Sequence, residues 1–218
     1  MSLKLIKNVL TSIGLFLLYL VINTLFYYKN NIALGNLISS LLTILIISYI
    51  YKDIIINNIK NIKKNFNKRI FIIGLILIII SIISSEIIRL LFKYDSFNND
   101  LVINNIKTYK YLYAFNVIVI TPFLEELIFR LPYHDNKNKI SFIVCVLIFS
   151  SLHITNLKDL IYIIPYLLPV IGLTLNYYKT DNIFISYLLH LINNLISVLL
   201  LIWWWYEKEK NKWIYIWN

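Results

Sequence analysis

The chain has 218 residues, of which 59% are apolar and 15% are charged, and its mean hydropathy is +0.71. A water-soluble domain normally carries about 25% charged residues, so the composition excludes a free globular protein and indicates that lipid is the solvent. The net charge of +10 does not indicate nucleic-acid binding, because the lysines and arginines lie between apolar blocks, where they flank membrane spans. Cys145 is the only cysteine, so no intramolecular disulfide and no thiolate zinc site are expected.

Seven segments are long and apolar enough to cross about 30 Å of hydrocarbon as helices. In chain order they are 9–28, 33–51, 70–92, 111–133, 140–157, 160–178 and 183–205. The sequence therefore predicts an all-α protein, a polytopic membrane helical bundle of about seven transmembrane helices. We expect one transmembrane domain over 1–218, with a motif-bearing core at about 111–205.

The loops predict how this bundle sits in the membrane. Segment 52–69 interleaves isoleucine with lysine, which is typical of an amphipathic helix on an anionic leaflet or of a solvated basic loop. Five tryptophans between 203 and 217 predict that the tail lies along the membrane interface. We expect the protein in the cell membrane with its N-terminus in the cytoplasm, because that orientation places more lysine and arginine on the inner side.

Ionisable side chains inside the predicted spans are the main indication of function. Each costs at least about 2.5–3.5 kcal/mol at the bilayer centre, so each needs a partner or a purpose. Glu86 and Arg89 lie three residues apart on one helix face, where they can neutralise each other. We expect this pair to be structural, and the alternative is that it lines a site.

The fourth predicted span contains two adjacent carboxylates, Glu125 and Glu126. Arg130 follows Glu126 by four residues, so the guanidinium can hold that carboxylate across one helical turn. Glu125 then remains unpaired by this arginine, and an unpaired carboxylate in low dielectric takes up a proton readily, as a general base for water must. Pro122 cannot donate to the carbonyl of Ile118, so we expect free backbone acceptors and room for a kink one turn earlier.

Two later predicted spans each carry a histidine with a partner four residues away. His153 follows Phe149, so imidazole and aromatic ring share one helix face. His190 and Asn194 share a face likewise, and both can donate hydrogen bonds toward one point. Alone, a helix histidine such as His153 is more often a hydrogen-bonded core residue than a catalyst, and the His190–Asn194 pair is as readily a packing contact as a site. Together with a carboxylate on a third span, they supply the parts for adding water to a carbonyl group and stabilising the oxyanion.

Three short motifs thus follow one another on separate hydrophobic spans: Glu125-Glu126-x-x-x-Arg130, Phe149-x-x-x-His153 and His190-x-x-x-Asn194. Their joint order resembles the CPBP family, which includes type II CAAX prenyl endopeptidases and bacteriocin-processing Abi membrane proteins. The resemblance covers roughly the last half of the chain. It implies an intramembrane endopeptidase that hydrolyses a peptide bond of a membrane-associated peptide or lipidated protein.

The resemblance also implies a role for each motif residue. Glu125 and His153 are implied to activate water, and His190 and Asn194 to form the oxyanion hole. The implied supporting residues are Glu126, Arg130 and Phe149.

Two other functions remain open. Some members of this family are non-catalytic, so a bacteriocin self-immunity or scaffold protein is the main alternative. A proton relay or transporter is a second alternative, because glutamate and histidine chains in membranes carry protons. It is disfavoured by the lack of an inverted repeat and of paired glycine-broken helices.

A metal site is a further open alternative. Glu125, His153 and His190 are ligand types that suit a divalent metal such as zinc with an open position for water. The resemblance favours hydrolysis without a metal, so no cofactor is expected.

The predicted depths of the site residues do not match. At 1.5 Å per residue, His153 lies about 20 Å from the cytoplasmic end of its span, and the other three candidate catalytic residues lie about 11–17 Å from theirs. Either the helices tilt or the boundary of the predicted span 140–157 must shift.

Overall fold

The computed structural model describes residues 3–27, 31–94 and 96–216, with side chains as far as residue 207. The described residues form helices joined by short connections and contain no strand. The α-helices are α1 (Leu3–Leu25), α2 (Ile32–Ile50), α3 (Lys52–Lys60), α4 (Ile62–Asn65), α5 (Lys68–Phe92), α6 (Phe97–Phe115), α7 (Thr121–Phe129), α8 (Lys139–Ser151), α9 (Ile163–Thr180) and α10 (Ile183–Ile216). A π-helix, η1 (Asn116–Ile120), and two 3₁₀ helices, η2 (Leu131–Tyr133) and η3 (Leu157–Tyr162), connect some of them. The prediction of an all-α helical bundle is confirmed.

The number of spans differs from the prediction. Six helical segments of the described chain are long and apolar enough to cross a membrane: Leu3–Leu25, Ile32–Ile50, Lys68–Phe92, Phe97–Tyr133, Leu157–Thr180 and Ile183–Glu207. The predicted span 140–157 is wrong, because α8 ends at Ser151 after 13 residues, or about 20 Å, which is shorter than the hydrocarbon core. Asn156 then caps η3 by accepting from the backbone N–H of Lys158 at 3.1 Å. His153 therefore lies in a loop after α8. Of the two explanations for the mismatch in depth, the shifted boundary of the predicted span 140–157 is the one observed.

The segment before the paired carboxylates contains two irregularities. α6 bends at Lys110, whose φ is 48°, so a polar helix that hydropathy did not predict precedes the apolar part. The π-helical turn η1 then leads into α7, where Pro122 has no N–H to donate to the carbonyl of Ile118. The backbone carbonyl groups that Pro122 is expected to leave free thus lie beside a π-helical turn, which is wider than an α-helical turn.

Segment 52–69 is helical and docked onto the bundle. Asn58 of α3 is buried, and its carbonyl oxygen accepts from Nδ2 of Asn182 at 2.6 Å. Its Oδ1 accepts from the backbone N–H of Ile183, also at 2.6 Å. Because Ile183 begins α10, this asparagine satisfies one of the free N–H groups at the start of the longest helix.

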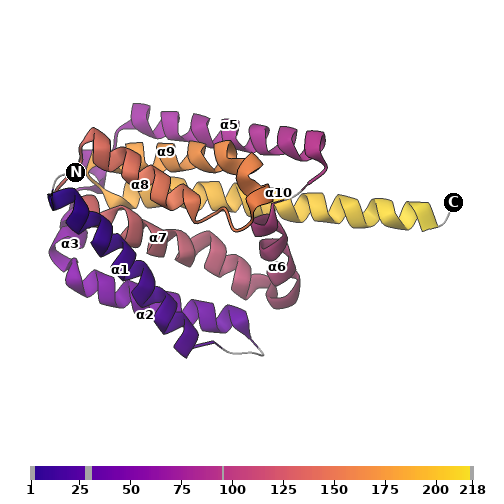
Figure 1. Cartoon of the computed structure of the whole chain (residues 1–218), viewed down its shortest axis with the longest axis horizontal. Coiled ribbons are helices and arrows are strands. Elements are labelled where there is room, and N and C mark those ends of the chain that lie inside the picture. The colour runs from indigo at the N-terminus through magenta and orange to yellow at the C-terminus, as the bar shows by residue number, and fades with distance from the viewer. Residues whose placement is uncertain (1–2, 28–30, 95, 217–218) are drawn as a thin grey trace.

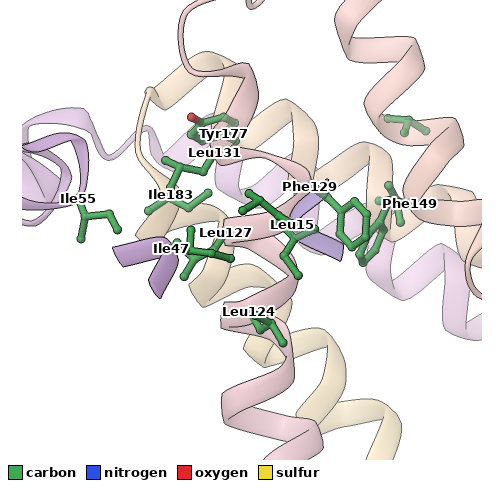
Figure 2. Packing of buried hydrophobic residues seen from close by; sticks show 13 residues of the cluster. Leu15, Ile47, Ile55, Leu124, Leu127, Phe129, Leu131, Phe149, Tyr177 and Ile183 are labelled. Carbon is green, nitrogen blue, oxygen red and sulfur yellow. The ribbon is translucent and has the colours of Figure 1, made fainter. Parts of the chain in front are cut away.

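α7 lies at the centre of the hydrophobic core. Figure 2 shows Leu124 and Leu127 of α7 and Leu131 of η2 following one another along the chain, beside Ile47 of α2 and Leu15 of α1. All but Leu15 of these side chains are at most 2% exposed, so the helix that carries the paired carboxylates is anchored in the hydrophobic core. The tail behaves differently: α10 projects beyond the other helices at its C-terminal end (Figure 1). The tryptophans of the tail are predicted to lie at the membrane interface. The side chains of Trp213 and Trp217 lie outside the part of the chain whose side chains the structure describes.

α5 and α9 lie side by side (Figure 1) and make the most extensive helix contact in the described chain. The contact depends on two glycines that face each other. A Cβ atom added to Gly172 of α9 would lie 3.1 Å from Cα of Gly74 on α5. Nδ2 of Asn176 donates to the carbonyl of Ile70 at 3.2 Å across the same contact. Small residues and one interhelical hydrogen bond are the usual means of joining helices in lipid.

We expect Gly172→Leu to lower the free energy of unfolding by about 1–3 kcal/mol, because the new side chain would force the two backbones apart. Thermal unfolding of the detergent-purified protein measures this change. Gly14→Leu is the matched control: a Cβ atom at Gly14 of α1 meets no heavy atom within 4 Å. Equal midpoints for the two variants would show that α5 and α9 do not require the close approach.

Candidate active site

A buried carboxylate, Glu126 of α7, organises the polar cluster. Its Oε1 lies 3.0 Å from Nη1 of Arg130 and 2.9 Å from Nδ1 of His190. Its Oε2 accepts from the hydroxyl of Ser186 at 2.6 Å. The expected i, i+4 ion pair with Arg130 is therefore present, with both side chains fully buried. Two of the partners come from α10, so this one carboxylate joins α7 to α10.

The Arg130 guanidinium is held by charge and stacking. Within the described chain, none of its three nitrogens makes a well-directed hydrogen bond, although Nη1 is at ion-pair distance from Glu126. Its Cζ lies 4.1 Å from the centroid of the Phe149 ring, in cation–π geometry. The arginine therefore depends on Glu126 for charge balance, because little else compensates its lost hydration.

His190 lies between the two adjacent glutamates. Nδ1 faces Glu126, and Nε2 lies 3.4 Å from Oε2 of Glu125. Glu125 is thus not paired with Arg130, as expected, but it does have a partner from α10. The ring can donate to both carboxylates only when both nitrogens carry hydrogen, and that form balances the charge of the cluster. The Glu125 side chain remains 24% exposed, whereas Glu126 is fully buried.

His153 lies just beyond α8, and its contacts leave one nitrogen available. Nδ1 is 3.2 Å from the carbonyl oxygen of Phe149, which can only accept, so Nδ1 carries the hydrogen in the neutral ring. The lone pair is then on Nε2. The ring packs between Phe149 and Tyr166, with centroid distances of 5.0 and 5.4 Å. Its loop is held by Thr155, whose hydroxyl donates to buried Asp159 at 3.4 Å.

Phe149 is the aromatic centre of the cluster. Besides Arg130 and His153, its ring contacts that of His190, edge to face, at 5.9 Å. A single aromatic ring therefore packs against the arginine and against both histidines. This arrangement gives a physical reason for an aromatic residue four positions before His153.

Asn194 is bound to the irregular turn before α7. Its Nδ2 donates to the carbonyl of Val117 in η1 at 3.0 Å. The hydroxyl of Tyr187 donates to the carbonyl of Val119 in the same turn at 3.1 Å. The π-helical turn thus exposes backbone acceptors that side chains of α10 satisfy.

The candidate catalytic residues line one cavity of about 390 Å³. Glu125, His153, His190 and Asn194 all contribute to its wall, although they come from α7, the loop after α8, and α10. The supporting residues Glu126 and Arg130 lie behind the wall, and Phe149 is part of it. Sequence reasoning missed several wall residues, because no motif or spacing singles them out: Tyr19, Asn36, Tyr113, Asn116 and Tyr166.

The metal alternative has no matching ligand geometry. No group of three or more histidine, cysteine, aspartate or glutamate side chains in the described chain is arranged to hold a metal ion. Both nitrogens of His190 face carboxylate oxygens, and Nδ1 of His153 faces a carbonyl. Glu125, His153 and His190 therefore do not form a three-ligand set.

We expect Arg130→Gln to destabilise the protein by about 3–5 kcal/mol, because it leaves two carboxylates, Glu125 and Glu126, with His190 as their one cationic partner, so that one negative charge is uncompensated. Adding Glu126→Gln should recover part of this loss, since the double variant has no unbalanced charge. Thermal unfolding in detergent, measured for both variants and the wild type, tests the pair. If the single and double variants are equally unstable, the ion pair does not contribute as its geometry indicates.

Comparison with known families agrees with these motifs. Residues 107–196 match the family model described as type II CAAX prenyl endopeptidase Rce1-like. The match contains all three motifs and η1, α7, α8 and α9. Comparison with curated proteins and with solved structures gave no match. The motif-bearing segment 107–196 of this multi-pass membrane protein is therefore similar to the Rce1-like type II CAAX prenyl endopeptidases, in agreement with the resemblance of its motifs.

Proposed function

We propose that this protein hydrolyses a peptide bond of a membrane-associated peptide or lipidated protein, using water activated by Glu125 and His153. The observation that carries the proposal is the shared cavity, whose wall contains a carboxylate, two imidazoles and an amide from three parts of the chain. Converging groups of these types in one pocket suit hydrolysis of an acyl bond. The match to a protease family supports peptide hydrolysis as the reaction class.

In the proposed first step, a water molecule lies between the Glu125 carboxylate and Nε2 of His153. Glu125 takes a proton from the water as the water oxygen bonds to the carbonyl carbon, and the carbonyl electrons move onto the substrate oxygen. The proton held by Glu125 then passes to the substrate nitrogen as the C–N bond breaks. The products are a carboxyl group and an amine, and Glu125 returns to its starting state.

The proposed oxyanion donors are Asn194 and His190. Asn194 uses one N–H for the carbonyl of Val117, which leaves its second N–H for the substrate. Nε2 of His190 lies 3.4 Å from Glu125, longer than the roughly 2.7–2.9 Å of a strong charge-assisted hydrogen bond. A substrate oxygen can therefore compete for that N–H. Glu126 holds Nδ1 of the same ring and so keeps it aimed at the cavity.

The membrane in which the protein lies and its orientation there are also proposed. The protein spans the membrane several times, and we place it in the cell membrane with a cytoplasmic N-terminus on the strength of its loop charges. A non-catalytic immunity or scaffold protein would bind a partner without needing Glu125. The variants below separate these two functions.

We expect Glu125→Gln to abolish cleavage while the protein stays folded, because the amide keeps the shape but cannot accept the proton of water. The assay uses purified protein, a pool of membrane-associated peptides and mass spectrometry, and it is run both with and without a strong chelator. Asp135→Asn is the matched control, because this exposed carboxylate pairs with Lys4 at 3.3 Å and is not part of the cavity wall. Wild-type cleavage that persists in Glu125→Gln would refute the proposed base. Cleavage that the chelator abolishes and zinc restores would favour the metal alternative.

We expect Asn194→Ala to reduce kcat by about 10²–10³-fold with little change in KM, since an oxyanion donor acts mainly in the transition state. Steady-state kinetics on the best peptide of the pool measure the two constants. A raised KM with an unchanged kcat would instead assign Asn194 to substrate binding.

A further inference from the structure

The cavity extends well beyond the four candidate catalytic residues. It follows one face of α10 for almost four turns, and the α10 residues in its wall include His190, Asn194, Ser197, Leu201 and Trp204. Their spacing of three or four residues is that of one helix face. His190 and Trp204 are 14 positions apart, so at 1.5 Å per residue the cavity runs about 21 Å along the helix.

The far end of the cavity carries a guanidinium group. Cζ of Arg89 on α5 lies 4.6 Å from the centroid of the Trp204 ring, and both residues are part of the wall. Nε of Arg89 donates to Oε2 of Glu86 at 3.1 Å, and Nη2 donates to the same oxygen. The pair expected from the sequence is therefore present, and it also lines the cavity.

This guanidinium can bind a second carboxylate. Glu86 uses a single oxygen for Nε and Nη2, which leaves the two N–H groups of Nη1 as further donors. The Glu86 side chain is 48% exposed, and ion pairs between residues three apart on an exposed helix face are weak. Trp204 covers one face of the guanidinium and keeps it at the cavity wall.

We propose, resting on the function proposed above, that Arg89 binds a substrate carboxylate about four to six residues from the scissile bond. The proposed oxyanion donors Asn194 and His190 lie ten and 14 positions before Trp204, or about 15 and 21 Å along the helix. An extended peptide advances about 3.3–3.6 Å per residue, so four to six residues cover this distance. The carboxylate belongs either to an aspartate or glutamate side chain or to the free C-terminus of the substrate. Arg89 is a specificity residue in this proposal and takes no part in bond cleavage.

The structure offers a matched control for Arg89. Nζ of Lys107 on α6 also lies 4.6 Å from a tryptophan centroid, that of Trp205, the next residue of α10. Lys107 is not part of the cavity wall. Lys107→Gln therefore removes a cation from a neighbouring tryptophan without changing the cavity.

The test uses the full-length purified protein and randomised peptides of about 14 residues, each made with a free C-terminal carboxylate and as the amide. Mass spectrometry identifies the cleaved bonds and the residues around them. Wild-type cleavage should be enriched for a carboxylate at one fixed position, about four to six residues from the cleaved bond. The acid and amide series show whether that carboxylate is a side chain or the C-terminus.

We expect Arg89→Gln to lower kcat/KM for carboxylate-bearing peptides about tenfold, mainly through KM, and to leave neutral peptides within about twofold. Lys107→Gln should preserve the wild-type profile. Arg89→Glu should shift the preference at the same position to lysine or arginine, which a merely destabilised protein would not do. Cleavage that depends on Glu125 but shows no positional preference, or the same preference in wild type and Arg89→Gln, would overturn this inference alone. Absence of Glu125-dependent cleavage would overturn both proposals.

Discussion

The buried charge of Glu126 is the constraint on which the polar interior depends. A carboxylate in a lipid-surrounded core is tolerated only when cations and hydrogen-bond donors surround it. Here they come from Arg130 on the same helix and from His190 and Ser186 on α10. The need to satisfy one charge therefore brings α7 and α10 together and orients the imidazole of His190. Glu125, about 100° further around the helix, faces the cavity because its neighbour occupies the buried side.

Phe149 and the short helix that carries it place the second histidine. α8 is too short to span the membrane, so the chain leaves the helix before His153 and returns through η3. Asp159 of η3 stabilises this return: it is fully buried, and its Oδ1 accepts from the hydroxyl of Tyr94 at 2.9 Å. The loop can then hold an imidazole in the wall of the cavity that Glu125 also lines, without a continuous helix. The mismatch in depth calculated from seven spans therefore came from treating 140–157 as one straight span.

The helices outside the matched segment contribute to the site in a different way. The segment 107–196 carries all the candidate catalytic groups. The other walls of the cavity come from Tyr19 of α1, Asn36 of α2 and Arg89 of α5, together with the C-terminal part of α10. The close α5–α9 contact through Gly74 and Gly172 keeps α5 against the matched segment and holds Arg89 within reach of Trp204. In the proposed function, the groups that act on the peptide bond and those that contact the rest of the substrate thus come from different parts of the chain.

The sequence by itself determined the helical membrane class, the family resemblance of the motif-bearing segment and the Glu126–Arg130 pair. These follow from local quantities: apolar run length, motif order and the i, i+4 geometry of one helix. Hydropathy could not distinguish the apolar α8 from a membrane span. The length of α8 depends on where the backbone leaves the helical conformation, and hydropathy does not report that position. The tertiary structure alone decided that His190 bridges Glu125 and Glu126, since its ring reaches them across more than 60 residues of chain. It also decided that the cavity reaches Arg89, because that contact depends on how α5 and α10 pack, and packing between distant helices leaves no periodic signal in either one.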